Sequence, residues 1–285
     1  MAGTLFVVAT PIGNLEDVTL RALRILREVD VIAAEDTRRT ARLLAHYEIR
    51  KPLTSVREHN EARAAAALVG RMERGESVAL VSDAGTPGIS DPGARLVAAA
   101  RERGIPVVPI PGPSAVAAAI SIAGFPMDEF VFMGFPPHGG SARADWFRRI
   151  KEEVRAVVFF EAPHRIHRTL AELTPLLVNR HIMLGRELTK VHEFSVVQPT
   201  SVELAETLSR GEFVLVISPA ERGQKEPIEA ERATTLIDAL ISAGGMEESE
   251  AVQLLARALS VEDRELIKVV KKYRIYVKQQ NRVAP

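Results

Sequence analysis

Short apolar runs rich in Val and Ile alternate along the chain with longer segments in which apolar residues recur every three or four positions. The first such pair, at residues 5–9 and 20–27, has the periods of a strand followed by an amphipathic helix. Several runs are apolar at every position, which is typical of parallel strands buried on both faces. The alternation predicts an α/β fold. Further strands are expected at residues 30–34, 77–82, 105–110, 129–133, 156–160, 182–185 and 212–217, and helices at residues 40–47, 61–74, 94–103, 115–123, 164–177, 204–209, 234–243, 248–259 and 261–278.

Glycine and proline are unevenly distributed. The chain has 18 Gly and 17 Pro, and 18 of these 35 residues fall between positions 85 and 140. Such clustering suits loops that bring backbone close to a ligand, and it also suits the join between two domains. We expect an N-terminal α/β domain at residues 1–115, a second α/β domain at 116–218, a linker at 219–231 and a helical C-terminal region at 232–285.

The composition is that of a soluble globular protein, with 46% hydrophobic and 26% charged residues and no apolar run near the roughly 18 residues of a membrane span. Basic and acidic residues balance at 37 each, so any nucleic-acid binding must depend on local patches. The lack of Cys excludes disulfides and thiolate zinc sites. Together with a start that has no signal-type segment, it predicts a cytoplasmic protein without a membrane partner.

Several common catalytic motifs are missing. No GxGxxG follows the first strand and there is no Walker A motif, which argues against the usual dinucleotide and triphosphate sites. The segment GPSAV at residues 112–116 begins like the nucleophile elbow of a serine hydrolase but lacks the second glycine. His164 and His167 share a helix face without an evident third ligand, so we expect no metal site.

Polar residues gather where two of the predicted strands end. Ligands of open α/β sheets bind beyond the carboxyl ends of the strands. There, TPIGNL follows the first strand at residues 10–15, and EDTRRT follows the second at residues 35–40. The pair Glu35 and Asp36 is suited to orient a hydroxyl group, and the arginines beside them to pair with a phosphate. The alternative is that Asp36 or Thr37 is simply the N-cap of the next helix.

The densest cluster of small and polar residues is VSDAGTPGISDPG at residues 81–93, directly after a strongly apolar strand. Its turns and carboxylates suit a ligand with amine and amide groups. The segment IPGPSA at residues 110–115 then enters a helix of small residues, whose free first-turn N–H groups suit a carboxylate or a ribose. A helix that is simply initiated by proline is the alternative for this second segment.

Taken together, these segments resemble the ribosomal RNA methyltransferases of the tetrapyrrole methylase superfamily. The resemblance covers residues 3–218, and the tail matches more loosely. One departure is HGG at residues 138–140, where the family has a basic segment. The resemblance is carried by ATPIGNLEDVTLRAL (9–23), AAEDTRRTARLL (33–44), EHNE (58–61), LVSDAGTPGISDPG (80–93), PIPGPSA (109–115), GFPP (134–137) with Arg143, FEAPHRI (160–166) and RELTKVHE (186–193).

The resemblance implies a homodimer of chains with two α/β domains and S-adenosylmethionine in the cleft between them. This fold differs from that of Rossmann-like methyltransferases, which accounts for the missing GxGxxG. The implied reaction is 2′-O-methylation of a cytidine in the decoding region of 16S rRNA, within the small ribosomal subunit. By motif, the cofactor is expected to contact Pro11, Asp83, Ala84, Gly85, Thr86, Ile89, Ser90, Ser114, Ala115, Phe160 and Leu188.

Methyl transfer to a ribose hydroxyl requires mainly alignment, with a carboxylate or a neutral amine to accept the proton. The candidates for that group are Glu35, Asp36, Glu187, Lys190 and Glu193, of which we favour the first two; Lys190 and Glu193 are equally suited to pair with each other at i and i+3. The basic tail at residues 268–285, with interleaved Tyr273 and Tyr276, is suited to phosphates and bases. Contacts to RNA are expected from Arg38, Arg39, Arg143, His164, Arg165, Lys271, Lys272 and Arg274.

Two other functions remain open at this point. A methylase of a small molecule such as a porphyrin precursor predicts a closed apolar substrate cleft and no use for the basic tail. A non-catalytic RNA-binding or ribosome-assembly protein predicts RNA binding that is unaffected by S-adenosylmethionine. The segments EDTRRT, EAPHR and RELTK argue against the first, and PIGN, DAGTPGISDPG and PGPSA against the second.

Overall fold

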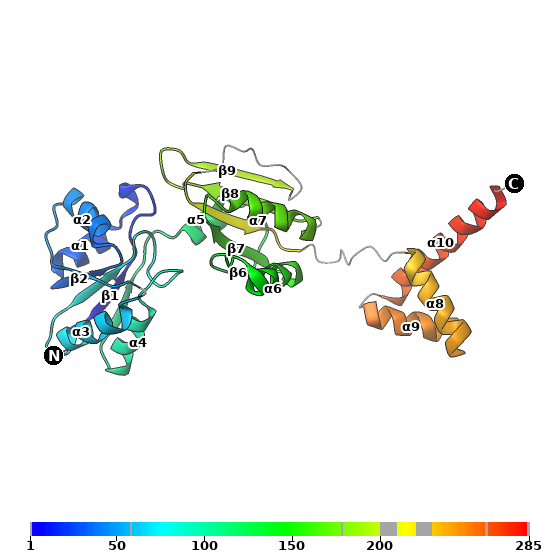
Figure 1. The fold of residues 1–285 in the computed structure, drawn as a ribbon, viewed down its shortest axis with the longest axis horizontal. Coiled ribbons are helices and arrows are strands. Elements are labelled where there is room, and N and C mark those ends of the chain that lie inside the picture. Colours follow the sequence, from blue (N-terminus) through cyan, green and yellow to red (C-terminus); the bar gives the residue numbers. More distant parts are fainter. Residues whose placement is uncertain are drawn as a thin grey trace. The chain divides into compact units, whose positions relative to one another are not determined.

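The computed structural model describes residues 2–57, 59–177, 179–199, 210–220, 230–259 and 262–283. The chain divides into two compact units, Met1–Ala220 and Glu221–Pro285 (Figure 1). Glu58, the helix expected at residues 204–209 and most of the expected linker lie outside the described residues. Within the described ranges, none of the helices combines the length and apolar character that a membrane span requires.

Five parallel strands form the first sheet, in the order β3-β2-β4-β1-β5. Every residue of β2 and β4 is buried, as expected for central parallel strands. The edge strand β3 was not predicted because it has only three residues, all half-buried, and so lacks a clear apolar pattern. The strands are β1 (Leu5–Val8), β2 (Val31–Ala34), β3 (Leu53–Ser55), β4 (Val78–Val81) and β5 (Val107–Ile110).

Helices cover both faces of this sheet, and side chains that alternate along each strand pack against them in turn. Ile32 of β2 belongs to the apolar cluster shared with the first two helices, whereas its neighbour Val31 belongs to the cluster shared with the next two. The sheet is therefore a buried layer, and the ends of its strands are left uncovered by these helices. The helices are α1 (Leu20–Glu28), α2 (Thr37–His46), α3 (Glu61–Glu73) and α4 (Ala94–Glu102).

The second sheet also has five strands, in the order β6-β7-β10-β8-β9. Only β6 and β7 are parallel, and the other pairs are antiparallel. The edge strand β9 was not predicted, since it mixes Val with Ser, Gln and Pro. The strands are β6 (Phe130–Phe132), β7 (Ala156–Glu161), β8 (His181–Arg186), β9 (Phe194–Pro199) and β10 (Phe213–Ile217).

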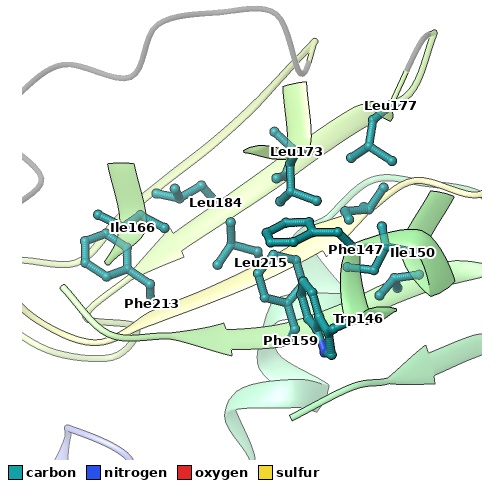
Figure 2. Packing of buried hydrophobic residues seen from close by; sticks show 13 residues of the cluster. Trp146, Phe147, Ile150, Phe159, Ile166, Leu173, Leu177, Leu184, Phe213 and Leu215 are labelled. Atoms are coloured by element: carbon teal, nitrogen blue, oxygen red, sulfur yellow. The ribbon is translucent and has the colours of Figure 1, made fainter. Parts of the chain in front are cut away.

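Aromatic residues fill the core on one face of the second sheet, between the strands and the helices α6 (Gly140–Glu152) and α7 (Ile166–Leu173). Figure 2 shows Phe159 beside Trp146, and their ring centroids are 5.1 Å apart in an edge-on arrangement. The opposite face is covered by α5 (Ala115–Ile122), whose Val116 packs with Val158 and Val214 of the strands. The two sheets with their helices confirm the predicted α/β class.

The second unit consists, in its described residues, of α8 (Ala230–Gly244), α9 (Glu248–Leu259) and α10 (Asp263–Val283). Its apolar core includes Ile237, Leu255 and Leu266, one from each helix. Arg274 of α10 forms ion pairs with Asp238 of α8 and with Glu248 of α9. This arginine therefore joins the three helices to one another.

Candidate active site

A cavity of about 280 Å³ lies at the carboxyl ends of β1, β2 and β4. One wall is the loop after β1, which includes Pro11 and Gly13, and the floor is Ser82 to Ala84 after β4. Arg39 and Arg42 of α2 line a third side, and Lys190 and Glu212 reach it from the second sheet. The cavity thus forms at the edge where ligands of open α/β sheets bind.

The PIGN loop and the RELTK segment meet at this cavity. The backbone N–H of Asn14 donates to Oγ1 of Thr189 at 3.0 Å. A Cβ on Gly13 would lie 2.3 Å from Cγ of Lys190 and 3.0 Å from the backbone oxygen of Leu188, so only glycine fits. Glu187 and Thr189 have φ angles of 52° and 69°, in the left-handed region that non-glycine residues rarely adopt. A tight backbone contact therefore couples the two motifs.

Lys190 is held as an ammonium ion. Its Nζ donates to Glu187 at 2.9 Å and to Glu212 at 3.0 Å. Burial lowers the pKa of Lys190, but its hydrogen bonds to the two carboxylates outweigh this, and the net shift of the pKa is upward. The prediction that Lys190 serves as a neutral proton acceptor does not fit this environment. Its expected pairing with Glu193 is replaced by pairs with Glu187 and Glu212.

The DAGTPGISDPG loop is tied to the first strand and to the PGPSA segment. Thr10 and Gly85 exchange two backbone hydrogen bonds of 2.9 Å. Oγ1 of Thr86 donates to the backbone oxygen of Pro113 at 3.2 Å, directly before Ser114, which is the N-cap of α5. Gly85 has a φ of +77°, a conformation that glycine adopts at little cost and in which it pairs with Thr10 at the end of β1.

Residues expected at the cofactor converge from five segments of the chain. Pro11, Asp83 and Ala84 line the cavity. Ile89, Leu188 and Phe160 belong to one apolar cluster, together with Ile12 and Val116. The other expected residues, Gly85, Thr86, Ser90, Ser114 and Ala115, occupy the loop and helix start that the Thr86 hydrogen bond connects.

The carboxylates after β2 differ in basicity. Asp36 is the N-cap of α2, and hydrogen bonds from the side chain and backbone of Arg38 lower the pKa of Asp36 to about 2. Burial and the nearby carboxylate of Asp83 raise the pKa of Glu35. Asp83 itself accepts a hydrogen bond from the backbone N–H of Asp36 at 2.9 Å. Of the predicted pair, Glu35 is therefore the stronger base.

Asp91 was not predicted as a site residue. Burial, followed by the nearby carboxylate of Glu35, raises the pKa of Asp91 to about 6. The signal in the sequence is that Ser82, Asp83 and Asp91 all belong to one loop motif, but their proximity to Glu35 depends on the sheet order. Among the described residues, no group of three or more His, Asp or Glu side chains is arranged to hold a metal ion.

The arginines of α2 form a basic edge of the cavity. Arg38 is 82% exposed and pairs with Asp36, and Arg39 is 60% exposed with a long ion pair of 3.5 Å to Asp83. Arg42 lines the cavity but was not predicted. Its spacing of three residues from Arg39 on one helix is the signal that would have found it.

Two of the arginines expected at RNA are engaged within the fold instead, one buried and one half-buried. Arg143 is 3% exposed and donates to Glu172, Thr169 and the backbone oxygen of Pro137 at 2.8–2.9 Å. Arg165 forms an ion pair of 2.6 Å with Glu161. Because Arg143 is buried and the guanidinium of Arg165 is paired with the buried Glu161, neither arginine is free to bind RNA in this structure.

The other residues expected at RNA differ in their exposure. His164, beside Arg165, is exposed. In α10, Lys271 and Lys272 are exposed, while Arg274 is engaged by Asp238 and Glu248. Arg274 is therefore a link between helices, and His164 and the two lysines remain available to a phosphate.

Curated relatives match most of the chain. The protein named ribosomal RNA small subunit methyltransferase I of Neisseria meningitidis serogroup B is 48% identical over 232 residues, which are 79% of this chain and 79% of that protein. The protein of the same name from Synechocystis is 41% identical over 268 residues, which are 93% of this chain and 96% of that protein.

Solved structures of low sequence identity share the fold. The methyltransferase CobJ matches 77% of this chain and 95% of its own with a TM-score of 0.60 at 21% identity. Uroporphyrin-III C-methyltransferase from Thermus thermophilus, solved in complex with S-adenosyl homocysteine, matches 76% of this chain and 97% of its own with a TM-score of 0.53 at 18% identity. The model of the tetrapyrrole (corrin/porphyrin) methylases matches residues 4–205. With the motifs of the sequence, the paired sheets and these relatives in agreement, the chain belongs to the tetrapyrrole methylase family.

Proposed function

We propose that this chain transfers a methyl group from S-adenosylmethionine to the 2′-hydroxyl of a cytidine in the decoding region of 16S rRNA. The family supports methyl transfer, and the names of the relatives support ribosomal RNA of the small subunit as the acceptor. The observation that carries the proposal is the cavity at the strand ends, which combines a basic edge of Arg39 and Arg42 with the loops of the cofactor motifs.

The residues around the cavity fit S-adenosylmethionine. Backbone at Gly88 and Ser90 is left-handed and both residues are exposed, which suits hydrogen bonds from their peptide groups to polar parts of a ligand. Ile89 and Leu188 provide an apolar wall suited to an adenosine. When bound, the cofactor supplies an activated methyl group together with its own leaving group.

In this proposal Glu35 accepts the proton of the ribose hydroxyl. Its raised pKa makes it a better base than Asp36, whose low pKa suits an N-cap that orders α2. We expect Glu35→Gln to lower kcat by 10²-fold or more while the dissociation constant of S-adenosylmethionine stays within about twofold. A methyl-transfer assay measures kcat, and calorimetry measures the dissociation constant of S-adenosylmethionine. Full turnover by this variant would remove Glu35 from the mechanism.

Arg39 and Arg42 are proposed to pair with phosphates beside the methylated ribose, with the exposed Lys271 and Lys272 as a second set of contacts. Each lost phosphate contact should make the negative slope of log K against log salt concentration less steep by about one.

We further propose that the protein acts in the cytoplasm as a homodimer. Light scattering of the purified chain tests the dimer.

The experiment that tests the function is transfer of labelled methyl from S-adenosylmethionine to small subunits isolated from cells that lack this protein, followed by mapping of the modified nucleotide. A 2′-O-methylcytidine in the decoding region is the expected result. Transfer to a porphyrin precursor and none to subunits or free rRNA would instead identify a small-molecule methylase. RNA binding that is indifferent to the cofactor, without transfer, would identify an assembly protein.

A further inference from the structure

An exposed aromatic ring stands on the loop between β6 and α6. Phe135 is 50% exposed, although its neighbour Pro136 is buried. Its ring contacts that of Phe160 at 5.5 Å between centroids, and Phe160 in turn contacts Phe132 at 5.1 Å. Phe160 belongs to the apolar cluster behind the proposed cofactor wall, and Phe135 touches the outer side of that cluster. The ring therefore presents one half to solvent at the border of the site.

The loop that carries this ring is held at consecutive residues. The guanidinium of Arg143 donates to the backbone oxygen of Pro137 at 2.9 Å. Arg168 reaches the backbone oxygen of His138 at 3.5 Å, and Arg165 contacts Nδ1 of the same residue at 3.3 Å. Three arginines thus fix two adjacent residues of one short loop.

Two carboxylates, one buried and one half-buried, hold these arginines in turn. Glu161 is 1% exposed and accepts from Arg165 at 2.7 Å and from the hydroxyl of Thr169, which itself accepts from Arg143. Glu172 accepts from both Arg143 and Arg168. Buried ion pairs contribute little net stability compared with apolar packing, so a network of this kind is better explained by what it positions.

The position of the loop places the ring beside the proposed methyl-transfer site. Gly134 has a φ of +60°, and a Cβ there would lie 3.5 Å from Oγ of Ser90, in the DAGTPGISDPG loop. The backbone N–H of Phe160 donates to the oxygen of Gly134 at 2.8 Å. Polar side chains stand at the surface around the ring's loop, since His138, His164 and Arg168 are all exposed, and the Arg168 guanidinium brings a positive charge.

We propose that Phe135 is a stacking surface for a nucleobase of the RNA substrate next to the methylated nucleotide, held in place by the arginine network. Proteins read unpaired RNA by stacking bases on aromatic side chains beside basic groups, and the ring, the fixed loop and the exposed guanidinium of Arg168 are the parts that this needs. The inference rests on the proposed RNA substrate. It adds to that function a contact for the base, where the cavity provides contacts for phosphate and ribose.

The test compares the wild type with Phe135→Ala, Phe135→Tyr and the control Phe130→Ala, which removes a ring of similar exposure (47%) from the edge strand β6. Steady-state methyl transfer to small subunits gives KM and kcat, and calorimetry gives the dissociation constant of S-adenosylmethionine. We expect Phe135→Ala to lower kcat/KM for subunits about tenfold, which corresponds to about 1.4 kcal/mol. Cofactor affinity should stay within about twofold, Phe135→Tyr should restore most of the loss, and Phe130→Ala should match the wild type.

Three results would overturn the stacking role while leaving the proposed function intact. The first is that the wild type transfers methyl to subunits and Phe135→Ala is equally active. The second is an equal loss with alanine and tyrosine, which would indicate a packing role. The third is a matching loss of cofactor affinity in Phe135→Ala, which would assign the ring to the adenine. If the wild type transfers no methyl to subunits, the proposed function falls, and the stacking role falls with it.

Discussion

Helix α4 takes its N-terminal cap from a side chain of another helix, and removing that side chain should lower the free energy of unfolding by a defined amount. Glu61 of α3 is 7% exposed, and its Oε1 accepts the backbone N–H groups of Gly93 at 2.8 Å and Arg95 at 2.9 Å. Gly93 is the N-cap of α4 and cannot supply a side chain, since its φ is +128° and a Cβ would lie 2.7 Å from Leu80. Glu61 therefore caps α4 at the point where the loop of residues 82–93 passes into the helix.

The expected cost of Glu61→Ala follows from these two bonds. A lost helix cap costs about 1 kcal/mol, and a hydrogen bond to a charged group contributes about 1.5–3 kcal/mol. Because the two bonds share one oxygen, we expect a loss of about 2–4 kcal/mol in the free energy of unfolding. Glu61→Gln keeps an acceptor oxygen and should lose only about 1 kcal/mol. The freed loop should also weaken binding of S-adenosylmethionine several-fold in the alanine variant.

The assay is urea unfolding followed by circular dichroism, with calorimetry for the cofactor. Glu73→Ala is the matched control, since Glu73 ends the same helix, is 44% exposed and forms a surface ion pair of 2.9 Å with Arg103. Surface ion pairs contribute about 0–1 kcal/mol, so this control should lose at most about that amount. Equal losses for Glu61→Ala and Glu73→Ala, or a glutamine variant as unstable as the alanine variant, would refute the capping argument.

Two further predictions concern the loops around the cavity. Because burial raises the pKa of Asp91 to about 6, the folded chain holds this proton more tightly than the unfolded chain, and the stability it contributes below about pH 4 is lost as the pH rises to about 6. Asp91→Asn should therefore have a higher Tm than the wild type above pH 6, with the difference vanishing near pH 4; a constant difference across this range would contradict the titration. Gly13→Ala should reduce methyl transfer at least tenfold, because its Cβ would lie 2.3 Å from Cγ of Lys190 and force the two loops apart. Gly139→Ala, with open space around an extended backbone, is its control and should be neutral in the same activity assay.

The local motifs of the chain could be interpreted from the sequence because they depend on neighbours in the chain. Asp36 caps α2 through a hydrogen bond to the residue two positions later, which is the alternative that the sequence left open. The role of Glu61 could not be found in this way, since its partners lie more than thirty residues away. Arg143 shows the same limit, because its burial depends on packing between α6 and α7.

The α/β class, most of the strands and the loops that carry the site could be predicted from the apolar pattern, because burial on two faces and helical period both leave a trace in the residues. The order of the strands, the mixed second sheet and the edge strands β3 and β9 could not be predicted in this way and follow from the folded structure. The contacts of Lys190 with two carboxylates and the rise in the pKa of Asp91 to about 6 also depend on the folded structure. Strand pairing joins segments that are distant in the chain, and pKa values depend on the desolvation and the charges that this folding brings together.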